Sequence, residues 1–200
     1  GELPLSEEQQ NALRKALESG LSVITGGPGT GKTTIIRTFA EICGSLGRRV
    51  ALASPTGRAA KRLEQMTGQK ASTIHRLLAY DPYQHRFRYG PGNPLPVDTL
   101  VMAEASMLDV LLARDLLQAL APGTQLVLVG DADQLPSVGP GNLLRDLVES
   151  RAITVCHLTT IHRQQAGSLL VQNAHRINRG EGPYLPTGKQ WHGEDCVFIE

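Results

Sequence analysis

The residues from Gly26 to Thr33 have the types and spacing of a phosphate-binding loop. They read Gly-Gly-Pro-Gly-Thr-Gly-Lys-Thr and match the pattern G-x-x-x-x-G-K-T between an apolar run and an amphipathic segment. Glycines let successive backbone N–H groups point inward, and a following helix adds partial positive charge. We therefore expect a nucleoside triphosphate to bind Gly27, Pro28, Gly29, Thr30, Gly31, Lys32, Thr33 and Thr34, with Lys32 on the β- and γ-phosphates and Thr33 on Mg²⁺.

An acidic residue follows the apolar run Leu100–Ala103. Phosphate-loop ATPases carry an Asp-Glu pair at such a strand end, where the Asp holds Mg²⁺ and the Glu deprotonates the attacking water. Here Glu104 is present, but Ala103 occupies the preceding position. A natural degenerate site and an inactivating substitution both fit this alanine, and a solvated charge at a strand end is the alternative for Glu104.

Two further polar groups follow apolar runs. Gln125–Val129 leads into Gly130-Asp131-Ala132-Asp133-Gln134-Leu135-Pro136, where Gln134 can bond the γ-phosphate or the attacking water. Arg163, after the next such run, can approach the γ-phosphate from the side opposite Lys32. The alternatives are a turn in which both aspartates cap backbone N–H groups, and a surface arginine.

Two segments place small hydroxyls and a cation where strands end and helices start. These features suit the phosphates of a nucleic acid strand, and the candidate contacts are Pro55, Thr56, Gly57, Arg58, Thr73 and His75. Ser72 is equally well explained as a helix N-cap, and His75 as a buried core histidine.

Composition suits one α/β domain without a membrane partner. The chain has 200 residues, a net charge of +1, and no apolar run near the ~20 residues of a membrane span. Three widely spaced cysteines favour a reducing, cytoplasmic location. The histidines and cysteines lack the spacing of a zinc site. The strand-like run at 196–200 predicts a fragment of a longer protein.

Strands and helices alternate along the chain. We expect strands near 21–25, 49–53, 98–103, 124–129 and 153–157. We expect helices near 31–46, 56–66, 72–79, 108–120, 141–149 and 167–179, with a further N-terminal helix capped by Ser6 and Gln9. This alternation predicts a doubly wound, mainly parallel sheet.

Residues 80–97 interrupt this alternation. They contain Pro82, Pro91, Pro94 and Pro96, and His85, Phe87 and Tyr89 alternate with Arg86 and Arg88. Such alternation predicts an exposed strand or hairpin, and a proline-rich surface loop is the alternative.

In this order the motifs resemble those of the first motor domain of a superfamily 1 DNA helicase of the RecD/TraA type. Leu5–Gln9 resembles the family's glutamine motif, which recognises adenine. Gln9 would have that role, or Gln10 if the motif is aligned one residue further along. The remaining segments are similar to motifs I (26–33), Ia (54–60), II (101–106), III (130–136) and IV (161–164). Thr73 and His75 would belong to the DNA-contacting segment that follows motif Ia.

The resemblance implies a RecA-like fold with helices on both faces of the sheet. Residues 1–200 would form motor domain 1A, and 80–97 a small 1B hairpin that acts as a strand-separating pin. The implied cofactors are ATP and Mg²⁺. The implied partners are single-stranded and duplex DNA, a second motor domain and recombination-complex subunits. The implied activity is 5′-to-3′ translocation along single-stranded DNA, used in recombination, repair or conjugation.

The sequence departs from the family at several points. Ala103 replaces the magnesium-binding Asp, and the motifs of the second motor domain are missing. His162 stands where the family usually has a Phe or Tyr that stacks on adenine, and its imidazole can still stack there with less area. We therefore predict a chain that binds nucleotide, hydrolyses it poorly and unwinds nothing. A catalytically silent nucleotide- and DNA-binding module is the main alternative. A phosphate-loop kinase is disfavoured because no Arg-rich lid follows Gln134.

Overall fold

The computed structural model describes residues 4–161 and 168–184. Helices and strands alternate as expected through most of this length. In chain order the elements are α1 (Glu7–Glu18), β1 (Leu21–Gly26), α2 (Lys32–Ser45), β2 (Val50–Ser54), α3 (Gly57–Thr67), β3 (Ala71–Thr73), α4 (Ile74–Leu77), β4 (Tyr80–Asp81), β5 (Arg86–Phe87), β6 (Thr99–Ala103), η1 (Ala105–Met107), α5 (Val110–Gln118), β7 (Gln125–Gly130), α6 (Leu143–Ser150), β8 (Thr154–Leu158) and α8 (Leu169–Asn178).

The main sheet has six parallel strands in the order β3-β2-β6-β7-β1-β8. β6 and β7 are buried along their whole length, as their continuous apolar runs predict. The order reverses direction at β1, so this is a doubly wound sheet. The predicted fold class is confirmed, and the five predicted strands agree with the structure within one residue at each end.

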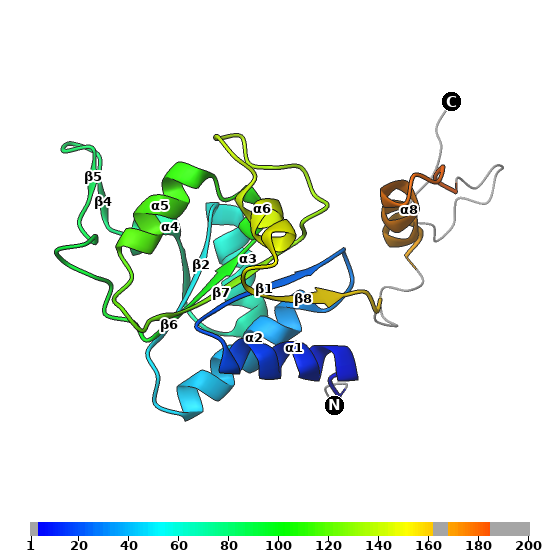
Figure 1. Ribbon diagram of the computed structural model, residues 1–200, viewed down its shortest axis with the longest axis horizontal. Helices are drawn as coiled ribbons and strands as arrows, with labels where there is room; N and C mark the ends of the chain where they lie inside the picture. The colour runs from blue at the N-terminus through cyan, green and yellow to red at the C-terminus, as the bar shows by residue number, and fades with distance from the viewer. Residues whose placement is uncertain (1–3, 162–167, 185–200) are drawn as a thin grey trace.

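Helices cover both faces of the sheet (Figure 1). On one face α1, α2 and α3 form a core that contains Phe39 and Ile24, and on the other α4, α5 and α6 form a core that contains Val23 and Leu116. Neighbouring residues of β1 enter opposite cores because side chains alternate along a strand. The two cores fix β1, and with it the point where the phosphate loop begins.

The predicted helix at 72–79 is confirmed only over its four middle residues and was wrong at both ends. Ala71–Thr73 forms the edge strand β3, with Thr73 opposite Ser54 of β2, and only four residues of α4 follow. Thr73 is the N-cap of α4, because its hydroxyl accepts a hydrogen bond from the backbone N–H of Arg76. A three-residue strand gives too short a pattern to separate from a helix start.

Residues 80–97 contain a small antiparallel hairpin of β4 and β5, which projects from one end of the molecule (Figure 1). The predicted strand over His85–Tyr89 is shorter in the structure: only Arg86 and Phe87 pair with β4. His85 lies in a left-handed turn with φ 49°, which ends the pairing on that side.

Among the described residues, no helix is both long and apolar enough to cross a bilayer.

Candidate functional site

The phosphate loop lies between β1 and α2, at the carboxyl edge of the sheet. Gly29 and Gly31 have φ values of 80° and 81°, in the left-handed region that favours glycine. A Cβ at Gly26 would lie 2.6 Å from the Leu158 carbonyl oxygen and 2.9 Å from the Thr30 hydroxyl. The glycine positions are therefore required by backbone conformation and by close approach.

Lys32 bends back over the loop that precedes it. Its Nζ donates to the carbonyl oxygens of Gly26 at 2.6 Å and Gly27 at 2.9 Å. Burial lowers the pKa of Lys32, and the nearby carboxylates of Asp131 and Glu104 oppose that shift. The ammonium thus lies among carbonyl oxygens at the centre of the loop, and phosphate oxygens could replace those carbonyl oxygens as its hydrogen-bond acceptors.

The first turn of α1 contacts this loop. Gln9 is buried, its Oε1 accepts from the Ser6 backbone N–H at 3.0 Å, and its Nε2 donates to the Thr30 carbonyl oxygen at 3.5 Å. The predicted capping box is confirmed. Gln10 is exposed and donates to the Leu5 carbonyl oxygen. Of the two candidate adenine readers, Gln9 is the one that contacts the phosphate loop.

The sheet order brings the candidate catalytic residues together. β7 lies between β1 and β6, so the residues after β6 and β7 end near the loop after β1. Glu104, half-buried in a left-handed conformation, and Asp131, almost fully buried, both act electrostatically on Lys32. Ala103 is the buried last residue of β6 and offers no oxygen there.

The turn after β7 is tied to its surroundings by hydrogen bonds. Asp131 accepts from the backbone N–H of Asp133 at 3.1 Å and from the Gln134 side chain at 3.4 Å, while Thr25 of β1 accepts from the Ala132 N–H. Asp131 therefore caps its own turn, as the alternative proposed, whereas the Asp133 carboxylate accepts from the Asn178 side chain. Gln134 remains exposed beside it, at the edge where the loop lies.

Helix α8 contacts both the loop and this turn, which the sequence did not reveal. His175 Nε2 lies 3.2 Å from the Pro28 carbonyl oxygen, and Asn178 donates to Asp133 at 2.7 Å. A Cβ at Gly27 would also collide with the His175 ring. No local signal could have shown this, because nearly 150 residues separate His175 from Pro28. His162 and Arg163 lie outside the described residues.

The two segments with candidate DNA contacts lie side by side. Pro55, Thr56, Gly57 and Arg58 follow β2, while Thr73 and His75 lie at the end of the adjacent β3 and in α4. The hydroxyls of Thr56 and Thr73 each cap a helix. Arg58 and His75 are exposed, so the core-histidine alternative is wrong.

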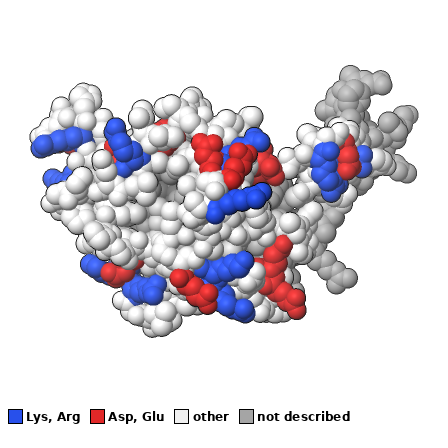
Figure 2. Space-filling view, in the orientation of Figure 1, with Lys and Arg blue, Asp and Glu red and all other residues white. Residues whose placement is uncertain are grey.

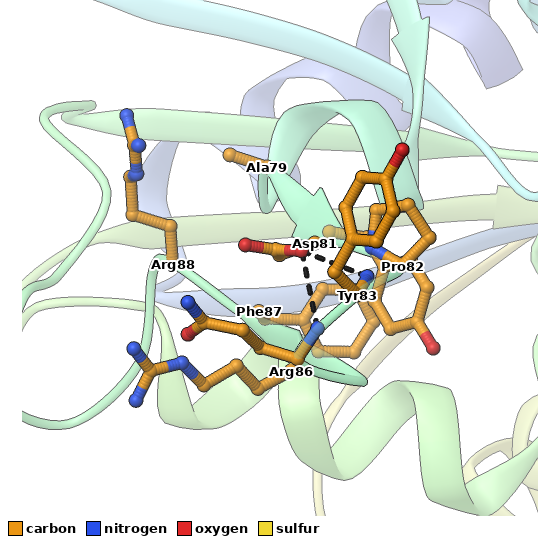
Figure 3. Close-up of a pocket in the computed structure, with 9 residues that line it drawn as sticks. Ala79, Asp81, Pro82, Tyr83, Arg86, Phe87 and Arg88 are labelled. Atoms are coloured by element: carbon orange, nitrogen blue, oxygen red, sulfur yellow. Dashed lines mark hydrogen bonds between the residues drawn. The ribbon is translucent and has the colours of Figure 1, made fainter.

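His75 connects this edge to the hairpin. Its ring lies 5.6 Å from the ring centroids of both Tyr80 and Phe87, which are 5.1 Å apart. Figure 2 shows Lys and Arg side chains at the end of the molecule where Figure 1 places the hairpin. In Figure 3, Arg86 and Arg88 extend to one side of the hairpin, away from Pro82, and line a hollow of about 730 Å³.

The residues present fit a nucleoside triphosphate. The left-handed glycines, the inward Lys32 and the start of α2 provide donors and positive charge in one loop. For Mg²⁺, the oxygens at hand are the Thr33 hydroxyl and nearby carboxylates. The described residues contain no cluster of three or more His, Cys, Asp or Glu able to hold a metal.

The sequence matches the AAA domain family over residues 4–192. It is 45% identical over 179 residues to the ATP-dependent RecD2 DNA helicase of Deinococcus radiodurans, covering 90% of this chain and 24% of that protein. It is 43% identical over 182 residues to the RecBCD enzyme subunit RecD of Mycolicibacterium smegmatis, covering 78% and 33%. The chain thus spans about a quarter to a third of these relatives.

Solved structures share the fold. The Pif1 helicase from Candida albicans superposes with a TM-score of 0.64 at 22% identity, over 94% of this chain and 50% of that one. Bacteroides Pif1 bound to ssDNA gives a TM-score of 0.59 at 22% identity, over 90% and 47%. At this identity the likeness shows the RecA-like α/β architecture alone.

Proposed function

This chain belongs to the AAA domain family, in the RecD-like group of superfamily 1 helicases, and we propose that it is the ATP-binding motor domain of an ATP-dependent DNA helicase. The observation that carries the proposal is the phosphate loop with Lys32 held inside it, beside Glu104 and Asp131. Residues 1–200 would form domain 1A of a longer protein.

ATP would bind with its triphosphate in the loop. Lys32 would exchange the carbonyl oxygens of Gly26 and Gly27 for oxygens of the β- and γ-phosphates, and the backbone N–H groups of 27–34 would complete the cradle. Gln9 and His162 would contact adenine. Mg²⁺, held by Thr33 and the phosphates, would neutralise part of the phosphate charge.

Hydrolysis would depend on the residues that follow β6 and β7. Glu104 would orient and deprotonate water, while Gln134 and Arg163 would respond to the γ-phosphate. Because Ala103 provides no carboxylate, we propose that the chain binds ATP but hydrolyses it slowly.

Single-stranded DNA would run across the edge formed by β2 and β3. Pro55–Arg58 and Thr73–His75 lie on adjacent strand ends, and exposed Arg86 and Arg88 extend that edge toward the hairpin. Closure against a second motor domain would move these groups along the DNA backbone by about one nucleotide per cycle. The hairpin would act as the pin that divides the duplex.

The biological setting follows the relatives. We propose 5′-to-3′ translocation in recombination, repair or conjugation, in the cytoplasm, with recombination-complex subunits as partners of the complete protein. The relative in Mycolicibacterium smegmatis is itself named as a subunit of the RecBCD enzyme.

One substitution separates this motor from the second candidate, a silent nucleotide- and DNA-binding module. That candidate is favoured by the buried, oxygen-free side chain of Ala103. Ala103→Asp supplies the missing ligand, so DNA-stimulated ATP hydrolysis should rise by about tenfold or more. Ala152→Asp, which adds the same charge at an exposed position, is the control. Unchanged hydrolysis in Ala103→Asp would instead support the silent module.

A further inference from the structure

Helix α8 makes two contacts with the candidate site that the proposed function does not use. His175 Nε2 lies 3.2 Å from the Pro28 carbonyl oxygen, and the Asn178 side-chain amide donates to the Asp133 carboxylate at 2.7 Å. His175 and Asn178 are three residues apart in a helix, so they lie on the same side of it. One side of α8 therefore meets both the phosphate loop and the turn after β7.

His175 contacts two successive residues of the loop. A carbonyl oxygen can only accept a hydrogen bond, so Nε2 of the half-buried His175 is the donor in its contact with Pro28. The same ring lies against Gly27, where a Cβ would be 2.5 Å from its Cε1. The imidazole therefore packs on Gly27 and donates a hydrogen bond to Pro28.

The Pro28 carbonyl belongs to the same peptide unit as the Gly29 N–H. That peptide bond is trans, so the carbonyl and the N–H point in opposite directions. A donor that holds the carbonyl on one side therefore sets the direction of the N–H on the other. Gly29 has a φ of 80° and no side chain to limit its backbone, so this peptide unit gains from a restraint outside the loop.

The hydrogen bond from His175 is independent of Lys32. Lys32 donates to the carbonyl oxygens of Gly26 and Gly27, and under the proposed function it would exchange them for phosphate oxygens. The Gly27 carbonyl would then keep the Thr30 hydroxyl, at 2.8 Å, as its donor. The Pro28 carbonyl would keep His175. The contact from α8 can thus restrain the loop while phosphate is bound.

We propose that His175 is a positioning residue for phosphate binding: by holding the Pro28 carbonyl it directs the Gly29 N–H toward an oxygen of the triphosphate, and Asn178 anchors the helix that carries it. Hydrogen bonds at the two ends of one peptide unit polarise it and strengthen each other. This inference rests on the proposed function, because that function places phosphate at the Gly29 N–H.

A role confined to docking α8 on the molecule predicts something different. In that case, substitutions of His175 release the helix but leave nucleotide affinity unchanged. Two variants separate the roles. His175→Phe keeps an aromatic ring against Gly27 and removes the donor, whereas His175→Gln removes the ring and supplies an amide donor. His157→Phe is the matched control, because His157 is an exposed histidine of β8.

The first test measures the affinity of the 200-residue chain for a non-hydrolysable ATP analogue, by calorimetry with Mg²⁺. His175→Phe should lower that affinity by about fivefold, because one hydrogen bond that orients the loop is lost. His175→Gln should stay within about twofold of the wild type, as should His157→Phe. Denaturant unfolding of each variant shows whether the fold is intact.

The second test follows the amide signal of Gly29 by NMR. In the wild-type chain, the ATP analogue should move this signal, because its N–H becomes a donor to phosphate. In His175→Phe, the signal should differ from the wild type before any nucleotide is added, and the analogue should move it less. His175→Gln should restore the wild-type response.

Unchanged affinity in His175→Phe, or an equal loss in His175→Phe and His175→Gln, would overturn the role of His175 as a donor. The same Gly29 signal and response in His175→Phe and the wild type would overturn it as well. If the wild-type chain failed to bind the analogue, the proposed function itself would be refuted instead.

Discussion

The phosphate loop and the β4–β5 hairpin are held in place in different ways. The loop follows β1, whose side chains enter both cores, and Lys32, Gln9 and His175 all bond to its carbonyl oxygens. The hairpin has two paired residues on each strand, and its base is attached by backbone hydrogen bonds to the Leu78 carbonyl oxygen and by the packing of Phe87 against the second core. Contacts from three separate helices hold the first region, whereas the second is held at its base.

This difference bears on what each region can do. A loop that must present backbone N–H groups to phosphate gains from a rigid surround, because misplaced donors bind less well. The exposed tip of the hairpin, residues 82–85, can change conformation without disturbing either core. We therefore expect substitutions in the loop to affect nucleotide binding and substitutions in the hairpin to affect DNA binding.

Glycine-to-alanine changes provide the sharpest contrast between the phosphate loop and residues 80–97, the segment that contains the hairpin. Gly26→Ala places a methyl against the Leu158 carbonyl oxygen, so it should lower the free energy of unfolding by about 1–3 kcal/mol and nucleotide affinity by more than about tenfold. Gly92→Ala, with no atom within 4 Å, should change stability by less than about 0.5 kcal/mol. Denaturant unfolding measures the change in the free energy of unfolding, and calorimetry measures the change in nucleotide affinity.

If Gly26→Ala and Gly92→Ala changed stability and nucleotide affinity equally, the difference drawn between the two regions would be contradicted. Gly44→Ala is a further control, because it lies inside α2 with open space around it. Its alanine should stabilise the helix by up to about 1 kcal/mol.

Phe87→Ala tests the aromatic cluster at the base of the hairpin. Loss of its contacts with His75 and Tyr80 should lower the free energy of unfolding by about 1–2 kcal/mol and speed amide exchange at 80–89. Affinity for single-stranded DNA should fall, while ATP affinity stays at the wild-type value. A loss of ATP affinity would show that the hairpin and the loop are not independent.

The smallest expected effect concerns the ion pair between Arg49 and Asp98, which lies just before β6. The Asp98 carboxylate accepts from the Arg49 backbone N–H and guanidinium, which lowers the pKa of Asp98 to about 2. The folded-state pKa lies below the unfolded value, so this stabilisation is present above about pH 4 and lost as pH falls toward 2.

Melting temperatures at pH 5 and pH 2.5 check this assignment. Asp98→Asn should reduce the melting temperature slightly at pH 5 and by less at pH 2.5, because the wild-type carboxylate is then partly protonated. The same deficit at both pH values would argue against it.

The sequence predicted the loop well because its determinants are local. Gly26–Thr33, the apolar run before it and the helix after it contain the backbone requirements within one segment. The capping box of Ser6 and Gln9 was predicted for the same reason. The five strands followed from continuous apolar runs.

Contacts between distant segments could not be predicted. His175 on Pro28 and Glu8 on Thr159 each join segments about 150 residues apart, and neither residue belongs to a local pattern. The edge strand β3 was missed because three residues carry little periodicity. The alternation around Phe87 indicated a hairpin but overestimated its length, because the backbone N–H groups of Arg88 and Tyr89 donate to the Leu78 carbonyl oxygen instead of to a partner strand.

Calorimetric titration of the 200-residue chain with a non-hydrolysable ATP analogue and Mg²⁺ tests the central claim most directly. The structure predicts saturable binding to the wild-type chain and a loss of at least about 100-fold in Lys32→Ala, because Lys32 supplies the charge inside the loop. Lys61→Ala, an exposed lysine of α3, should bind like the wild type. Absence of binding by the wild-type chain, or equal binding by Lys32→Ala, would contradict the assignment of this loop as a triphosphate site.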